Sequence, residues 1–153
     1  MPDTLLSMTQ TDGDALARQI FEAAFVVHST LGAGLREPAY ARCLAYELET
    51  RGLQIARDVP APIIYRNIRV DAGLAVALVV EGTIAVEVRA VERLLPSHDV
   101  PLLTYLKFSG HDLGLLINFN VPLIKQGIRT LLRQPYYYPP SLLEEKEKGS
   151  LLF

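Results

Sequence analysis

The sequence predicts an α/β fold (α+β), with helices at the start, short strands in the middle and a helix and strand near the end. Residues 14–52 carry apolar side chains every three or four positions, which is typical of amphipathic helices. Short β-branched runs between proline and glycine turns fill residues 54–90. A helix-length segment at 100–109 and an apolar run at 113–119 follow. The 153 residues are enough for one domain with a hydrophobic core.

The composition excludes several classes of site. Cys43 is the single cysteine, so the chain has no internal disulfide and no cysteine-based metal site. The net charge of -2 argues against a surface that binds nucleic acid through many phosphate contacts, although it allows a local basic patch. No apolar run is as long as a membrane span, and the N-terminus lacks the pattern of a signal peptide. We therefore expect a cytoplasmic protein with no membrane partner.

Three regions are expected along the chain. Residues 1–13 are polar or mixed and predict a flexible N-terminus, whereas residues 14–134 contain the periodic segments of one domain. A proline- and tyrosine-rich stretch then interrupts regular structure, and residues 135–153 form a C-terminal tail. This tail has charged residues between apolar ends. It fits either a short helix that docks on the domain or on a partner, or a disordered segment.

The first helix is expected over residues 14–31, with Asp14 as its N-terminal cap. Its apolar residues lie on one face, namely Leu16, Ile20, Ala24, Val27 and Leu31. His28 lies near that face, where packing or a hydrogen bond is the expected role. Gly32 and Gly34 then provide the backbone freedom for a tight turn.

A second helix is expected to begin at Glu37 and Pro38, because proline is tolerated in the first turn of a helix. Tyr40, Leu44 and Leu48 form its apolar stripe, and Gly52 stands where glycine commonly ends a helix. Taken alone, Glu37 fits a carboxylate that the helix dipole stabilises.

Residues 54–59, 61–65, 68–80 and 83–90 predict an antiparallel meander of strands. A helix over 100–109 is expected to end at Gly110, and residues 113–119 form an apolar strand. The pattern at 124–133 fits either a strand or a helix.

The most informative stretch is the expected hairpin around the Glu81–Gly82 turn. In its second strand, side chains alternate between the two faces, so Glu87 and Arg89 share one face. Burying either charge alone is costly, so the two side chains either form an ion pair at the strand end or line a cleft.

Several segments together resemble one known family. They are Gly34-x-x-Glu37-x-x-Tyr40, Leu48-Glu49-x-Arg51-Gly52, Leu78-Val79-Val80-Glu81, Glu87-Val88-Arg89, Leu102-Leu103-Thr104-Tyr105 and Leu115 to Pro122. This order resembles the GxxExxY proteins, small bacterial and archaeal members of the PD-(D/E)XK nuclease-like superfamily. The resemblance implies an α-β-β-β-α-β core, with a central mixed β-sheet flanked by helices. It also implies a site in which an Asp and the Glu at 37 and 87 hold a divalent metal while a Lys positions the attacking water.

The chain departs from that pattern at three site positions. Ala77 stands where the family has the metal-binding Asp of Arg-x-Asp, Arg89 replaces the Lys, and Pro101 replaces a Gln. Asp71 and Glu81 have the strand parity of Ala77 but lie roughly 20 and 13 Å along the strand, too far to substitute for it. Arginine stays protonated, so Arg89 cannot act as a base, but it can bind phosphate or pair with carboxylates.

The sequence therefore favours a nuclease-fold pseudoenzyme that has lost catalysis, needs no cofactor and acts by binding. The partner is another protein, a second copy in a homodimer, or nucleic acid bound weakly through Arg89 and Tyr105. The alternative is an active nuclease that uses Mg²⁺ or Mn²⁺, with Glu37 and Glu87 as metal ligands and Arg89 on the scissile phosphate. A third reading is a purely structural module. In each reading Glu37, Glu87 and Arg89 are expected to converge.

Overall fold

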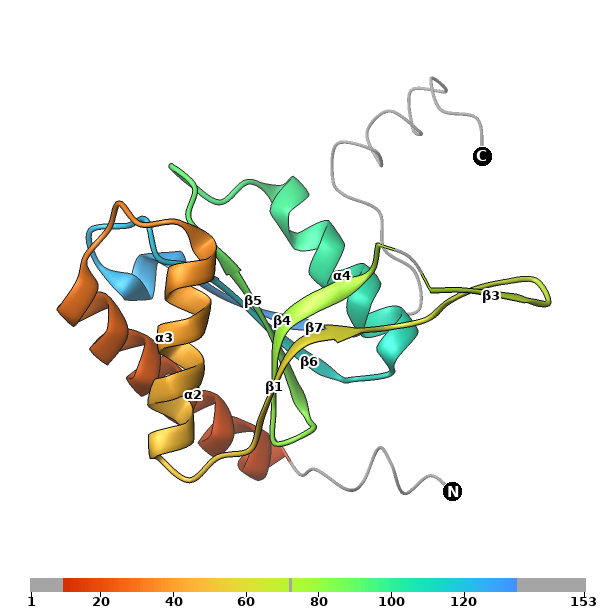
Figure 1. Cartoon of the computed structure of the whole chain (residues 1–153), viewed down its shortest axis with the longest axis horizontal. Coiled ribbons are helices and arrows are strands. Elements are labelled where there is room, and N and C mark those ends of the chain that lie inside the picture. Colours follow the sequence, from red (N-terminus) through yellow and green to blue (C-terminus); the bar gives the residue numbers. More distant parts are fainter. Residues whose placement is uncertain (1–9, 72, 135–153) are drawn as a thin grey trace.

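The computed structural model describes residues 10–71 and 73–134, which form a five-stranded sheet with helices on both faces (Figure 1). In spatial order the strands are β1 (Ile55–Pro60), β4 (Ala75–Val80), β5 (Ile84–Arg89), β6 (Leu113–Asn118) and β7 (Ile128–Leu132). Neighbouring strands are antiparallel except β5 and β6, which are parallel. The predicted α/β fold with a central mixed sheet flanked by helices is confirmed.

The helices form a layer on each side of this sheet. Helices α2 (Gln10–Leu31) and α3 (Glu37–Thr50) pack on one face. Helix α4 (Asp99–Ser109) packs on the other face, preceded by a 3-10 turn, η1 (Pro96–His98). Parallel strands cannot be joined by a tight turn. The connection between the parallel strands β5 and β6 therefore passes over one face of the sheet and contains α4.

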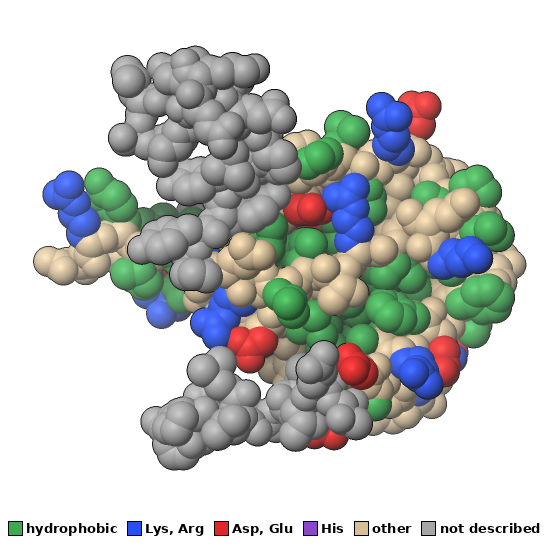
Figure 2. Space-filling model, turned by 180° about the vertical axis from the view of Figure 1, so that it is seen from behind, with side chains coloured by type: hydrophobic (Ala, Val, Ile, Leu, Met, Phe, Trp, Pro, Cys, Tyr) green, Lys and Arg blue, Asp and Glu red, His purple; other side chains and the backbone are tan. Residues whose placement is uncertain are grey.

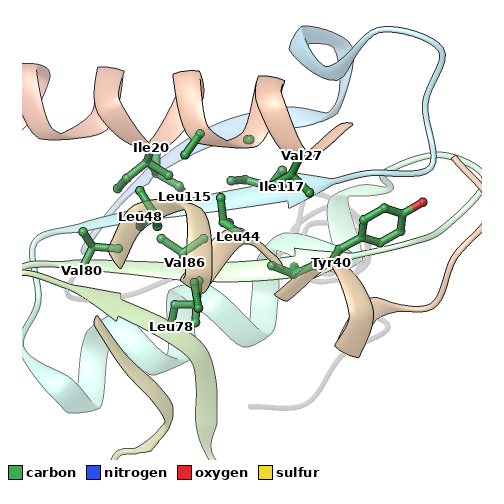
Figure 3. Close-up of a cluster of buried hydrophobic side chains, with 14 of the residues drawn as sticks. Ile20, Val27, Tyr40, Leu44, Leu48, Leu78, Val80, Val86, Leu115 and Ile117 are labelled. Carbon is green, nitrogen blue, oxygen red and sulfur yellow. The ribbon is translucent and has the colours of Figure 1, made fainter. Parts of the chain in front are cut away.

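The main core lies between the sheet and the pair α2 and α3 (Figure 3). The predicted stripe of α3 is fully buried, because Tyr40, Leu44 and Leu48 have no exposed surface. These side chains meet the apolar face of the central strands, represented by Leu78, Val80, Val86, Leu115 and Ile117. The N-terminal end of α3 is thereby fixed over β4 and β5.

Some element boundaries differ from those expected. Helix α2 already includes Gln10, so Asp14 lies inside the helix and cannot be its N-cap. Leu31, expected on the buried face of this helix, is 36% exposed. Residues 124–133, which fitted either strand or helix, contain a 3-10 turn, η2 (Ile124–Gly127), followed by β7. Residues 1–9 and the predicted tail at 135–153 lie outside the described residues.

The single meander expected for residues 54–90 is wrong in its pairing. Strand β1 pairs directly with β4, and the segment between them forms a separate hairpin of β2 (Ile63–Tyr65) and β3 (Ile68–Val70). Prolines at 60 and 62 interrupt the first run, and Gly73, with φ of 78°, turns the chain before β4 begins. The hairpin projects beyond the sheet (Figure 1).

A buried amide fixes the chain where it leaves β5. Asn118 is fully buried, its Oδ1 accepts hydrogen bonds from the Val91 and Asn120 N–H groups, and its Nδ2 donates to the Val91 carbonyl. The end of β5 is therefore held against the end of β6. Within the two described ranges, no helix has the length and apolar character that crossing a membrane requires.

Candidate functional site

The candidate site lies at the end of β5, where the β4–β5 ladder ends. Paired positions extend from Val80 and Ile84 to Leu78 and Val86, and no further. Glu87 follows this last pair, and its carboxylate receives hydrogen bonds from the Val88 N–H and from the Ala77 backbone. The predicted carboxylate and the alanine at the family's Asp position are therefore adjacent.

Glu37 reaches the same place from α3. It is the first residue of that helix, and its Oε2 accepts a hydrogen bond of 3.1 Å from the Ala90 N–H, one residue after β5. This contact joins residues far apart in the sequence and ties the start of α3 to the strand end. Glu37 thus has a structural role in addition to any chemical one.

Tyr40 fixes the turn that presents Glu37. Its hydroxyl donates a 2.6 Å hydrogen bond to the Gly32 carbonyl and accepts one of 3.1 Å from the Leu35 N–H. Its ring stacks on Phe119 with centroids 4.7 Å apart. Gly34 adopts a φ of 107°, which only glycine takes readily, so the Gly, Glu and Tyr of the motif shape a single turn.

We predict that Tyr40→Phe lowers the free energy of unfolding by about 1 kcal/mol, because the Leu35 N–H and the Gly32 carbonyl, in part-buried hydrogen bonds, each lose a partner. The ring stacking on Phe119 is retained in this variant, so the fold should persist. Chemical denaturation of wild type and variant measures the difference. A variant as stable as wild type would show that the hydroxyl does not hold the turn.

Arg89 lies beside both carboxylates. Its Nη1 is 3.7 Å from Oε1 of Glu87 and 3.9 Å from Oε1 of Glu37, and it donates to the Val88 carbonyl. The Arg89 and Glu87 side chains are only 20% and 14% exposed, whereas that of Glu37 is 41% exposed. The structure thus brings Glu37, Glu87 and Arg89 together as expected, with the guanidinium as the nearby cation.

A cavity of about 260 Å³ opens beside these groups. It is lined by Glu37, Pro38, Ala41, Asp58, Ala75, Val76, Ala77, Glu87 and Val88. Ala77 contributes only a methyl group where the family pattern has a carboxylate. The cavity therefore contains three carboxyl groups, those of Glu37, Asp58 and Glu87, and a methyl group at the position of the missing Asp.

Asp58 is a site residue that the sequence analysis missed. It lies on β1 between Arg57 and Val59, which pair with Leu78 and Val76, so it is opposite Ala77 on the neighbouring strand. Its backbone has a positive φ of 49°, a conformation that Asp tolerates better than most residues. Only the β1–β4 register reveals this position, and the expected meander gave β1 a different neighbour.

A second hollow, of about 550 Å³, adjoins the first. It shares Pro38, Ala41, Asp58 and Ala77 with the acidic cavity and adds Arg42 from α3 and Arg57 from β1. Both arginines are exposed, and neither forms an ion pair with another residue in the described part of the chain. Two available guanidinium groups therefore stand next to the predicted site.

Two other predicted positions lie elsewhere. Tyr105, expected to contact nucleic acid, is 1% exposed in the core between α4 and the sheet, where burial raises its pKa. It stacks near His111 and does not line the acidic cavity. The expected contact of Tyr105 with nucleic acid is therefore wrong, because Tyr105 lies on the face of α4 that packs against the sheet. Pro101 is exposed in the first turn of α4.

The electrostatics of the site centre on Glu87. Burial of its carboxyl raises its pKa above the usual 4.5, and the charge of Glu37 adds to the rise. Arg89 and the hydrogen bonds from Val88 and Ala77 oppose the shift without cancelling it. Ionised Glu87 is therefore incompletely compensated in the folded protein.

We predict that Glu87→Gln changes how stability depends on pH. Because the pKa of Glu87 is raised in the folded protein, the protonated carboxyl favours the folded state of wild type. This contribution to stability is lost as pH rises from about 4.5 through the folded pKa. The glutamine variant lacks this loss. The melting temperature of the variant relative to wild type should therefore be higher near pH 8 than near pH 4. An unchanged difference across that range would contradict the raised pKa.

The residues present do not fit a divalent metal site. Within residues 10–71 and 73–134, no three His, Cys, Asp or Glu side chains are placed to hold a metal ion together. The guanidinium of Arg89 lies within 3.9 Å of both glutamates, where its charge would repel a dication. Hard dications need several oxygen ligands, and here one of the expected carboxylates is a methyl group.

Comparison with known proteins points to one family. The model of the family described as the PD-(D/E)XK nuclease superfamily matches residues 14–131. The match covers most of α2, all of α3 and α4, the main-sheet strands up to most of β7, and every site position discussed above. Comparison with curated proteins and with solved structures gave no match.

Proposed function

The chain belongs to the PD-(D/E)XK nuclease superfamily, and from this premise we propose that it is a member that no longer cleaves and acts by binding a nucleic-acid backbone. We also infer that it belongs to the GxxExxY group and works in the cytoplasm of a prokaryote without a metal cofactor. The position of Arg89 between Glu37 and Glu87 carries this proposal.

Arg89 supports loss of catalysis on physical grounds. A nuclease of this superfamily needs a dication to lower the pKa of water and to neutralise the phosphate. A guanidinium supplies one positive charge to the two glutamates but has no open coordination position for water. Ala77 has no carboxylate, so the site lacks the ligand that would have favoured a metal ion over the guanidinium.

Retained binding is supported by Arg42 and Arg57 in the adjoining hollow. Arginine forms bidentate hydrogen bonds with phosphate oxygens, and both guanidinium groups are exposed. Because the whole chain has a net charge of -2, attraction to a polyanion must come from a local group of basic side chains such as this one. We therefore expect weak, strongly salt-dependent binding. Association with another protein or with a second copy is the competing outcome.

Asp58 favours a second candidate, an active nuclease that uses Mg²⁺ or Mn²⁺. This carboxylate lies opposite Ala77 and lines the same cavity as Glu37 and Glu87. Within the described residues no three such side chains are placed to hold a metal ion, so in this candidate Asp58 and the two glutamates would have to move closer together to bind one. Arg89 would then contact the scissile phosphate.

A plasmid-nicking assay separates the two candidates. Wild type should leave supercoiled DNA intact with Mg²⁺ and with Mn²⁺, and it should leave RNA intact as well. Glu87→Gln and Asp58→Asn serve as matched controls for contaminating nucleases. Cleavage by wild type that either substitution abolishes would overturn the proposal and establish the second candidate.

A further inference from the structure

The β2–β3 hairpin exposes apolar side chains that the fold does not use. Ile64, Tyr65 and Ile68 are 53%, 60% and 57% exposed, respectively. The hairpin extends away from the sheet, and the space-filling view shows hydrophobic and basic side chains gathered on this projection (Figure 2). Exposed apolar groups concentrated on one projection are typical of an interaction surface.

The tip of the hairpin presents an aromatic ring beside a cation. Tyr65 and Ile68 are directly opposite in the register, so their side chains share one face of the two-stranded sheet. The guanidinium of Arg66, in the turn between them, is 5.5 Å from the centroid of the Tyr65 ring. The tip thus offers a flat apolar ring with a positive charge close to it.

The hairpin continues the surface of the candidate site. A hollow at its base is lined by Arg69, Asp71 and Ala75, among other residues, and Ala75 also lines the acidic cavity. That cavity in turn adjoins the hollow of Arg42 and Arg57. A row of three adjoining hollows therefore runs from α3 to the hairpin.

The charge of the hairpin suits an anionic partner. Between residues 61 and 74, the charged side chains in the described part are Arg66, Arg69 and Asp71. Asp71 pairs with Arg69 at 2.8 Å, whereas Arg66 at the tip contacts the Tyr65 ring and forms no ion pair with another described residue. A polyanion that carries flat apolar groups can stack one of these groups on the ring and place a negative charge next to the cation.

We propose that the β2–β3 hairpin binds single-stranded nucleic acid by stacking an unpaired base on Tyr65, while Arg66 contacts the neighbouring phosphate. Unpaired bases expose their faces to aromatic side chains, whereas a duplex stacks those faces internally. The inference rests on the proposed binding function and specifies its substrate, because the strand would continue past Ala75 toward Arg57 and Arg42.

Fluorescence anisotropy with a labelled oligothymidylate, which cannot pair with itself, tests the proposal at low salt. A duplex of the same length serves as the comparison. Wild type should bind the single strand more tightly than the duplex, and Tyr65→Ala should weaken single-strand binding about tenfold. Tyr65→Phe should bind like wild type, because the ring is retained. Tyr46→Ala is the matched control, since Tyr46 is 70% exposed on α3 and outside the three hollows.

The results separate this inference from the proposed function. If wild type binds both forms equally and Tyr65→Ala has no effect, the hairpin inference fails while the binding function stands. If wild type binds neither form, both fail. If instead the protein self-associates and Tyr65→Ala abolishes the dimer in sedimentation experiments, the hairpin is an interface between two copies and the proposal is overturned.

Discussion

Replacing Arg89 with Met should lower the free energy of unfolding by about 2 kcal/mol near neutral pH. The guanidinium is the cation next to two carboxylates, and the side chain of Glu87 is only 14% exposed. Without Arg89, a largely buried negative charge loses its nearest compensation. The loss is less than for a fully buried pair, because water reaches Glu37, which is 41% exposed.

The same substitution should make stability more dependent on pH. Arg89 lowers the pKa of Glu87, so its removal raises that pKa further above the usual 4.5. The destabilisation should then be largest near pH 8 and should shrink as pH falls through the raised pKa values that Glu87 has in the two folded proteins, because a protonated carboxyl needs no neighbouring cation. Thermal and chemical denaturation at several pH values measure both effects.

Two matched variants control this experiment. Arg93→Met removes an exposed arginine just beyond the site and should change stability little. The double variant Glu87→Gln with Arg89→Met removes both charges and should recover much of the stability lost by Arg89→Met alone. If Arg89→Met and Arg89→Ala both melt like wild type near neutral pH, the guanidinium does not stabilise the site.

The double variant Ala77→Asp with Arg89→Lys should be the first to show metal-stimulated nicking of plasmid DNA. Ala77 lines the cavity beside Glu37 and Glu87, so an Asp there supplies the missing carboxylate. Lysine in place of Arg89 removes the planar guanidinium next to both carboxylates and provides the group that the family pattern has.

Neither single variant should cleave. Ala77→Asp keeps the fixed positive charge of Arg89 near the metal position, and Arg89→Lys leaves the metal short of one ligand. Pro101→Gln added to the double variant should increase activity if that position serves the site. The control is the double variant with Glu87→Gln, which should be inactive. Nicking by a single variant would show that the site is closer to activity than the geometry indicates.

Local patterns were sufficient to predict most of the fold. The helical spacing predicts the buried stripe of Tyr40, Leu44 and Leu48, which packs on the sheet. The alternation of side chains along a strand predicts the face on which Glu87 lies. Glycine at 52 and 110 ends α3 and α4 in left-handed conformations, as their positions suggested. The convergence of Glu37, Glu87 and Arg89 came from the ordered motifs of the family resemblance.

Features that depend on long-range pairing could not be read from the sequence. Asp58 joins the site only because β1 pairs with β4, a partner separated from it by the β2–β3 hairpin. The hydrogen bond from Ala90 to Glu37 likewise links residues that no local pattern relates. Tyr105 was misassigned because its place in a motif says nothing about which face of α4 meets the sheet.

We propose that the guanidinium of Arg89 has taken the place of a metal ion between Glu37 and Glu87. Calorimetric titration of Mn²⁺ into the wild-type protein tests it most directly, with the Ala77→Asp and Arg89→Lys double variant titrated in parallel. We predict no stoichiometric binding to wild type and a single binding site in the double variant. Binding of one Mn²⁺ per wild-type chain that Glu87→Gln or Asp58→Asn removes would contradict the claim.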